Sequence, residues 1–171
     1  MSGMSDATGL RVGSGLDVHP FDDGDARRPL VLCGVTIPGA PGLAGHSDAD
    51  VGAHAVADAL LGAAALGDLG SRFGVDRAET AGADSLALLA VVVADVTAAG
   101  WRVGNLDLTL VAQRPRLAEH RESMRTNLAG VCHLDVAAVS VKFTTTDRLG
   151  TIGRGEGIAG WCSCLLIADR G

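Results

Sequence analysis

The chain has 171 residues, of which 47% are hydrophobic and 3% aromatic, and its formal net charge is −6. This length fits one domain with a sizeable core, and the hydrophobic content argues against global disorder. The negative charge argues against a nucleic-acid groove or an anionic membrane surface as the main partner. All 14 basic residues except Lys142 are arginine, so a bound phosphate would meet mostly arginine, backbone N–H groups, hydroxyls or metal.

The first nine residues are small and polar. We expect residues 1–9 to form a flexible segment ahead of a domain over residues 10–171. They lack the basic region and apolar stretch of a secretory signal. The most apolar run, residues 86–96, is too short to cross a bilayer. The four cysteines form no CxxC pair, and we interpret them as small buried thiols of a protein kept in a reducing cytoplasm.

Hydrophobic periodicity and turn residues predict eight elements in the order β-β-α-α-β-α-β-β. The first two are strands over residues 10–16 and 30–37, which we expect to pair as a hairpin. A helix follows from about residue 48 to 66, with Ser47 or Asp48 as its cap. A second helix is expected from Asp84 to residue 99, and Gly100 would end it.

The second half of the chain alternates strands and one helix. A strand is expected over residues 101–113, where apolar and polar side chains alternate strictly. A helix would run from Pro115 to about Gly130, and strands are expected at 139–144 and 158–167. These elements predict a single α/β (α+β) domain in which a mixed sheet of four to five strands packs against helices.

A candidate metal site combines Asp17, His19 and His54. Side chains alternate along a strand, so Asp17 and His19 are expected on one side. On the first helix, Asp50, His54 and Asp58 are four residues apart and lie roughly on one face. Two histidines and one carboxylate match the ligand sets of catalytic zinc sites. A buried histidine bonded to an aspartate, without metal, explains the same residues equally well.

Further stretches carry chemistry that the pattern alone leaves open. The hydroxyls of Thr144–Thr146 can hold phosphate, or reflect β-propensity, and Asp147 suits a bridging divalent cation. Arg154, set between glycines, can fork onto phosphate or pair with Glu156 in a turn. Asp68 would oppose the dipole at a helix C-terminus, so it is either functional or part of an ordinary capped turn. The loop over 112–116 can bond a nucleobase, or be simply solvated.

Together these motifs resemble the 2-C-methyl-D-erythritol 2,4-cyclodiphosphate synthase family over nearly the whole chain from Arg11. The resemblance is carried by residues 17–19, 45–50 with His54, 58–70, 82–85, 144–146 and 153–157. It implies a phosphorus–oxygen lyase of the non-mevalonate isoprenoid pathway. Such an enzyme converts 4-diphosphocytidyl-2-C-methyl-D-erythritol 2-phosphate to the 2,4-cyclodiphosphate and releases CMP. Family members are homotrimers with three active sites between neighbouring subunits.

The resemblance also implies roles for individual residues. Asp17, His19 and His54 would bind one Zn²⁺ per subunit, and His46 and Thr145 would hold the phosphate through the transition state. An Mg²⁺ or Mn²⁺ ion would bridge the diphosphate and touch Asp147, which stands where the family has Glu. The expected substrate contacts near the zinc and beyond are Asp17, Val18, His19, His46, Ser47, Asp68, Leu69, Gly70 and Arg154. The expected cytidine diphosphate pocket consists of Ala112, Gln113, Arg114, Pro115, Arg116, Thr144, Thr145, Thr146 and Asp147.

Two other functional classes compete with this one. A non-catalytic module that binds metal or nucleotide could keep the trimer, although it would be free to lose the zinc ligands and phosphate-side residues that this chain has. A zinc hydrolase would need a general base near the open zinc position, and Asp48, Asp50 and Asp58 are the candidates. We expect a small-molecule substrate, and neither nucleic acid nor membrane as a partner.

Overall fold

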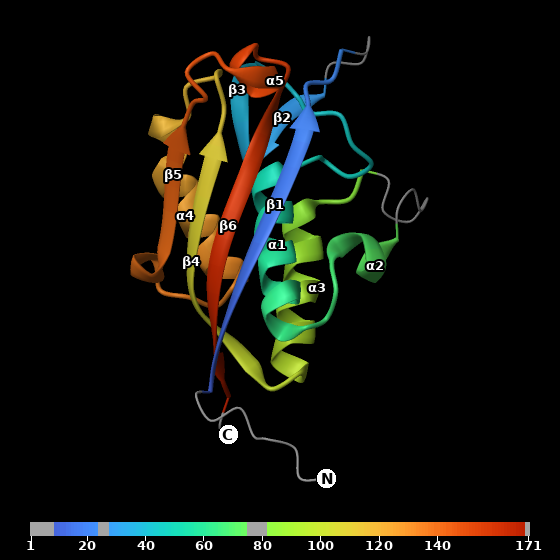
Figure 1. Ribbon diagram of the computed structural model, residues 1–171, viewed down its shortest axis with the longest axis vertical. Helices are drawn as coiled ribbons and strands as arrows, with labels where there is room; N and C mark the ends of the chain where they lie inside the picture. The colour runs from blue at the N-terminus through green and yellow to red at the C-terminus, as the bar shows by residue number, and fades with distance from the viewer. Residues whose placement is uncertain (1–8, 24–27, 75–81, 170–171) are drawn as a thin grey trace.

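A four-stranded mixed sheet in the order β1-β6-β4-β5 forms the centre of the molecule (Figure 1). The computed structural model describes residues 9–23, 28–74 and 82–169. β6 pairs antiparallel with β1 and with β4, whereas β4 and β5 run parallel. The strands are β1 (Leu10–Pro20), β4 (Trp101–Val111), β5 (Val139–Thr144) and β6 (Gly157–Ala168).

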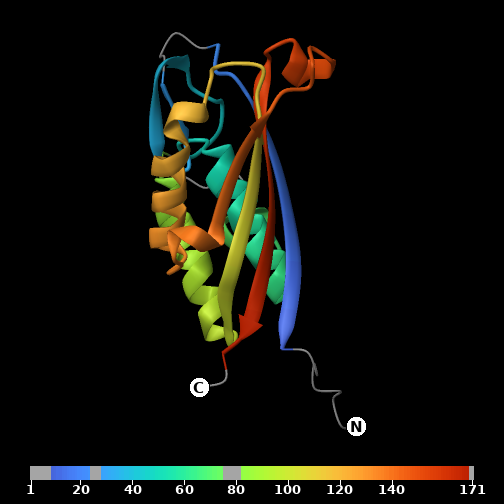
Figure 2. The same ribbon diagram turned by 90° about the vertical axis from the view of Figure 1, so that its left-hand side faces the viewer.

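Three long helices cover one face of this sheet (Figure 2). They are α1 (Val51–Ala64), α3 (Ser85–Ala98) and α4 (Arg121–Val131). The apolar side chains between helices and sheet form the core, which includes Leu60, Leu108 and Met124. Shorter elements are β2 (Pro29–Leu32), β3 (Val35–Pro41), α2 (Leu69–Phe73), α5 (Gly150–Gly153), and the 3₁₀ turns η2 (Ala118–His120) and η3 (Val136–Ala138).

Helix α1 lies unusually close to β1 because two glycines of the strand face it. A Cβ atom on Gly13 would lie 2.1 Å from the carbonyl oxygen of Ala59, and one on Gly15 would lie 2.2 Å from that of Ala55. Only glycine permits this approach of backbone to backbone. The helix contributes small residues in return, so the two elements meet almost without side chains between them.

Much of the expected secondary structure is confirmed. The mixed sheet packed against helices is present. Helix α3 begins after Asp84, whose side chain accepts the N–H of Leu86. Strands β4, β5 and β6 lie where alternation placed them, and all four cysteines are free and buried.

The expected pairing of the first two strands is wrong. Residues 30–37 form two strands, β2 and β3, which pair with each other across a tight turn. Cys33 and Gly34 occupy that turn with positive φ angles of 50° and 71°, as a two-residue hairpin turn requires. β1 pairs instead with β6 along its whole length. Among the described residues, the order therefore contains one strand, the two short helices α2 and α5 and two 3₁₀ turns beyond the eight elements expected.

Three element boundaries also differ from expectation. Helix α1 begins at Val51 with Asp50 as its N-cap, rather than Ser47 or Asp48. Its C-cap is Ala65, which adopts the left-handed conformation that ends helices. Helix α4 begins at Arg121 rather than at Pro115, because the chain from Val111 continues as a loop in which Ala112 N still bonds Thr144 O.

Asp68 has a structural explanation that differs from the one expected. It does not end α1 but begins α2, where its side chain accepts the N–H of Ser71 in a capping box. A carboxylate at a helix N-terminus is favourable, so the conflict with the dipole disappears.

Some expectations lie outside the described residues. The segment at 1–9, which we expect to be flexible, is described only at Gly9. Among the helices of the described chain, none combines the length and apolarity needed to cross a membrane.

Replacement of Gly15 by alanine tests the close approach of α1 to β1. The added methyl group would overlap the α1 backbone, so we expect Gly15→Ala to lower the free energy of unfolding by about 1–3 kcal/mol. Gly62→Ala is the matched control, because a Cβ there would meet only the oxygen of Ser14 at 4.0 Å. That variant should be neutral or more stable, since alanine favours the helix. Urea unfolding at one fixed protein concentration measures both, and equal stability of the two variants would contradict the packing argument.

Candidate metal centre and active site

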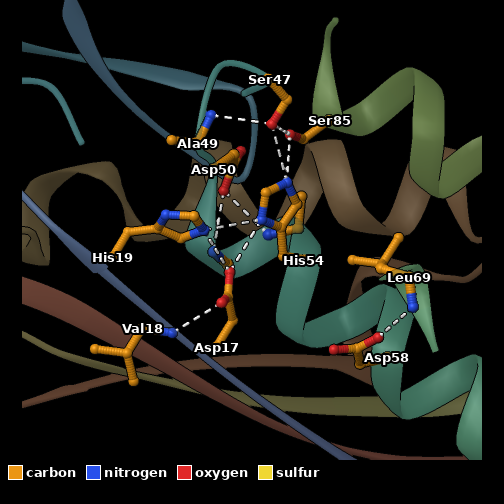
Figure 3. Close-up of polar contacts among 12 residues, drawn as sticks. Asp17, Val18, His19, Ser47, Ala49, Asp50, His54, Asp58, Leu69 and Ser85 are labelled. Atoms are coloured by element: carbon orange, nitrogen blue, oxygen red, sulfur yellow. Dashed lines mark hydrogen bonds and ion pairs between the residues drawn. The ribbon is translucent and has the colours of Figure 1, made fainter. Parts of the chain in front are cut away.

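Asp17, His19 and His54 converge at one point between β1 and α1 (Figure 3). Asp17 and His19 project from the same side of β1, as alternation predicts, and His54 comes from the first turn of α1. The Oδ2 atom of Asp17 lies 2.9 Å from Nδ1 of His54 and 3.0 Å from Nε2 of His19. The two ring nitrogens are 3.3 Å apart. The expected three-residue cluster is therefore confirmed in space.

The charges of this cluster reinforce one another. Burial by itself raises the pKa of Asp17, but the hydrogen bonds and charges of His19 and His54 outweigh it and hold that pKa well below its usual range. The hydrogen bond to Asp17 raises the pKa of His19, against the opposing effect of burial. The other nitrogen of His19, Nδ1, lies 2.7 Å from the carbonyl oxygen of Ala44.

This donor set fits a divalent metal ion. A carbonyl oxygen only accepts hydrogen bonds, so Nδ1 of His19 carries a proton and Nε2 is left to face the cluster. One carboxylate oxygen and two imidazole nitrogens then lie within 4.8 Å of one another. Such a set of nitrogen and oxygen donors is suited to zinc and to other transition metals.

The cluster opens into a cleft of about 390 Å³. His46, Ser47, Leu69 and Gly70, which were expected to contact substrate, line this cleft. Asp68 is not among the lining residues and acts as the cap of α2. Val18 turns its side chain outward, while its N–H donates to Oδ1 of Asp17 at 2.9 Å.

Asp58 holds the outer wall of the cleft in place through a hydrogen bond to α2. Its Oδ1 atom accepts the N–H of Leu69 at 2.8 Å, which ties α2 to α1 (Figure 3). Burial raises the pKa of Asp58, although this N–H lowers it. An ion pair joins α2 to α3, in which Nε of Arg72 donates to Asp95 at 2.6 Å. Phe73 and Leu88 complete the apolar part of the wall, and no motif in the sequence had pointed to them.

A second group of expected site residues lies at the ends of the parallel strands β4 and β5. Ala112 N donates to Thr144 O at 3.0 Å, and Arg148 N donates to the side chain of Gln113 at 3.2 Å. The hydroxyl of Thr145 donates to Asp147 at 3.3 Å. The carboxyl ends of neighbouring parallel strands are a common place for ligands.

Arg154 is held beside this second group. Its Nε atom donates to Glu156 at 2.5 Å in an exposed ion pair. Within one chain, Arg154 therefore pairs with Glu156 in a turn, which is one of the two alternatives that the sequence left open. The side chain of Arg114 passes close to Gly155. None of residues 112–116, 144–147 and 154 lines the cleft beside the Asp17 cluster. One chain therefore assembles two separate groups of candidate residues.

Asp50 is a structural residue, although it belongs to the same motif as His46. Its side chain is 0% exposed and accepts the N–H groups of Cys33, Gly34, Gly52 and Ala53 at 2.7–3.1 Å. Burial raises its pKa, while these bonds lower it. Asp50 thus points to the β2–β3 turn, and only His54 and Asp58 of the expected polar helix face line the cleft.

The chain is similar in sequence to proteins of one kind. The YgbB family matches residues 10–167. A 2-C-methyl-D-erythritol 2,4-cyclodiphosphate synthase of Chromobacterium violaceum is 55% identical over 157 residues, which cover 92% of this chain and 98% of the relative. The synthase of Paraburkholderia xenovorans is 52% identical over 160 residues, covering 94% and 99%.

Solved structures agree with these similarities. The bifunctional IspDF from Campylobacter jejuni has a TM-score of 0.88 at 40% identity, over 93% of this chain and 42% of that chain. IspF of Plasmodium falciparum in a CDP complex has a TM-score of 0.82 at 29% identity, over 95% and 99%. The similarity thus covers both groups of candidate residues.

Replacement of Asp50 by alanine tests its structural role. Four N–H groups would lose their acceptor, two of them at the start of the helix that carries His54. We expect Asp50→Ala to cost about 3 kcal/mol of unfolding free energy or more, since a lost cap and unpaired buried donors add together. Asp84→Ala, which removes the exposed cap of α3, should cost about 1 kcal/mol. Urea unfolding measures both, and an equal cost would mean that the buried bridge adds nothing to a simple cap.

Proposed function

The chain belongs to the YgbB family, and we propose that it acts as a 2-C-methyl-D-erythritol 2,4-cyclodiphosphate synthase through the site described above. It converts 4-diphosphocytidyl-2-C-methyl-D-erythritol 2-phosphate to the 2,4-cyclodiphosphate with release of CMP, in the synthesis of isoprenoid precursors. The observation that carries this function is the cluster of Asp17, His19 and His54 at the cleft, in a chain about half identical to named synthases. We place the reaction in the lyase class and the enzyme in the cytoplasm.

Two metal ions belong to this proposal. Asp17, His19 and His54 would hold one Zn²⁺ per subunit, and Zn²⁺ there supplies Lewis-acid polarisation of the phosphorus under attack. Asp147 would hold an Mg²⁺ or Mn²⁺ ion, which would neutralise negative charge on the diphosphate. A single exposed carboxylate suits that ion, which usually keeps several waters and shares its remaining positions with substrate phosphates.

The substrate itself supplies the nucleophile. An oxygen of its 2-phosphate forms a bond to the diphosphate phosphorus on the erythritol side, and the bond from that phosphorus to CMP breaks. Both reacting groups are anionic, so positioning and charge neutralisation must supply most of the catalysis. In this proposal His46 and Ser47 aim the 2-phosphate, and Thr145 holds the diphosphate. Residues 68–70 contact the methylerythritol part, and residues 112–116 with 144–147 enclose the cytidine diphosphate.

The active site would form between subunits of a trimer. The cleft beside Asp17 and the group around Thr145 lie apart in one chain, yet the substrate needs both. The face of the sheet away from the helices (Figure 2) also carries large exposed apolar side chains among the described residues. These are Leu10, Val12, Leu16, Val18 and Trp161. Apolar surface of this extent favours burial against a further copy, which supports the trimer.

Incubation with the substrate, Zn²⁺ and Mg²⁺ tests the reaction. We expect phosphorus NMR to show CMP and a cyclic diphosphate as the products. His46→Ala should lower turnover by about 100-fold or more, as removal of one transition-state contact does, and should leave the zinc content unchanged. His120→Ala, at the start of α4 and away from the cleft, is the matched control.

Other products would favour the competing classes. CMP with an open-chain 2,4-bisphosphate would make water the nucleophile and the protein a zinc hydrolase, with Asp58 in the cleft as its candidate base. Tight binding without release of CMP would indicate a non-catalytic binding module. Loss of zinc together with turnover in His46→Ala would move His46 from the substrate to the metal.

Mixed assemblies test whether the site is shared. His54→Ala would remove the metal side of a site and Thr145→Ala its phosphate side, so each variant alone should be nearly inactive. In trimers mixed one to one, about a quarter of the interfaces would combine an intact metal side with an intact phosphate side. We therefore expect about a quarter of the wild-type activity after the two are coexpressed. A mixture no more active than the separate variants would place the whole site within one subunit.

A further inference from the structure

Behind His54, on the side away from the cluster, lies a buried chain of hydrogen bonds through Ser85 and Asp48, two residues to which the proposed function gives no role. Nε2 of His54 lies 2.9 Å from the hydroxyl oxygen of Ser85 and 3.2 Å from that of Ser47 (Figure 3). The hydroxyl of Ser85 donates in turn to the carboxylate of Asp48. Ser85 is 1% exposed and Ser47 is 6% exposed, so water does not compete freely for these bonds.

The direction of these bonds is fixed from the Asp48 end. An ionised carboxylate only accepts hydrogen bonds, so the single hydroxyl proton of Ser85 is committed to Asp48. The Ser85 oxygen can then only accept from His54, which places a proton on Nε2. Nδ1 of His54, which faces Asp17 and His19, is then the ring nitrogen available to a cation.

The two histidines of the cluster are thereby held in the same way. Ala44 O keeps a proton on the far nitrogen of His19, and Ser85 keeps one on the far nitrogen of His54. The near nitrogens of both rings, with Oδ2 of Asp17, are the atoms that converge. Groups that bind the outer N–H of a ligating histidine fix its orientation and raise its basicity.

Asp48 is itself anchored firmly enough to act as the end of the chain. Its oxygens also accept the N–H groups of Ser85 and Asp50, each at 3.2 Å. Ser85 is the first residue of α3, so this bridge joins α3 to the loop that leads into α1. The His54 ring is thus held in position by two helices, α1, which carries it, and α3, which carries Ser85.

We propose that Ser85 and Asp48 are positioning residues for the metal, which act through His54 and touch neither metal nor substrate. Asp48 orients the Ser85 hydroxyl, and this hydroxyl holds the His54 ring with Nδ1 toward Asp17. The inference rests on the proposed metal site. It gives a function to the residues 82–85 motif, of which Ser85 is the last member.

Zinc affinity measured by competition with a chelator tests the inference without use of the reaction. We expect Ser85→Ala to weaken zinc binding by about 10–100-fold, the usual effect of losing such an outer partner. Ser85→Thr keeps a hydroxyl and should keep most of the affinity. Thr97→Ala is the matched control, because it removes a hydroxyl from the far end of the same helix, where it bonds only Val93 O, and it should not change the affinity.

A proton NMR signal distinguishes positioning from a general loss of structure. In the zinc-loaded protein, Nε2–H of His54 should give a slowly exchanging imidazole signal, which Ser85→Ala should remove and Thr97→Ala should retain. Asp48→Asn should also weaken zinc binding, and the double variant with Ser85→Ala should be no weaker than Ser85→Ala alone, because both act through one chain of bonds. If Ser85→Ala does not fold, Asp48→Asn decides the question by the same two measurements.

The outcomes separate this inference from the proposal on which it rests. Wild-type protein that binds no zinc would overturn the metal site itself. If wild-type protein and Ser85→Ala bind zinc with equal affinity and give the same imidazole signal, only the role of Ser85 and Asp48 is overturned. Loss of affinity and of the signal, with Thr97→Ala unaffected, supports it.

Discussion

The close contact between β1 and α1 is the constraint on which the site depends. Asp17 and His19 belong to the strand and His54 to the helix, and their ligand atoms lie 2.9–3.3 Å apart. Short side chains such as these meet only if the two backbones lie close together, and Gly13 and Gly15 remove the Cβ atoms that would separate them. β6 approaches the start of the same helix in the same way, because a Cβ on Gly160 would lie 2.7 Å from the oxygen of Val51.

Neighbouring polar residues of the loop before α1 make contacts with different parts of the structure. Asp50 turns inward and joins the start of the helix to the β2–β3 turn through four N–H groups. Asp48 points sideways to α3, and Ser47 lies against the rear of the His54 ring. Of these four residues, His46 and Ser47 line the cleft, and His46 is the exposed one. Structural bonds thus orient the loop, and the loop presents the exposed side chain of His46 to the cleft.

Local patterns predicted the site better than they predicted the sheet. Strand alternation placed Asp17 and His19 on one side, and helix spacing placed His54 and Asp58 on one face, because both depend only on the geometry of a single element. The pairing of β1 with β6 joins opposite ends of the chain, whereas neighbouring strands pair more often, so the expected hairpin was wrong. The bond from His54 to Ser85 was missed for the same reason, since the two residues are 31 positions apart in the sequence and no local pattern links them.

The two groups of candidate residues differ in the charges that they carry. Among the residues that the structure describes, those that line the cleft beside Asp17 include two aspartates and no lysine or arginine. A substrate with a phosphate and a diphosphate would be repelled there unless histidines and metal supplied the positive charge. The second group carries arginine at 114, 116, 148 and 154, together with the hydroxyls after β5, but has no cluster of metal ligands among its described residues. In the proposed trimer the two groups would face each other between subunits, and the arginines of the second group would then help to neutralise the phosphates held beside the metal ligands of the first.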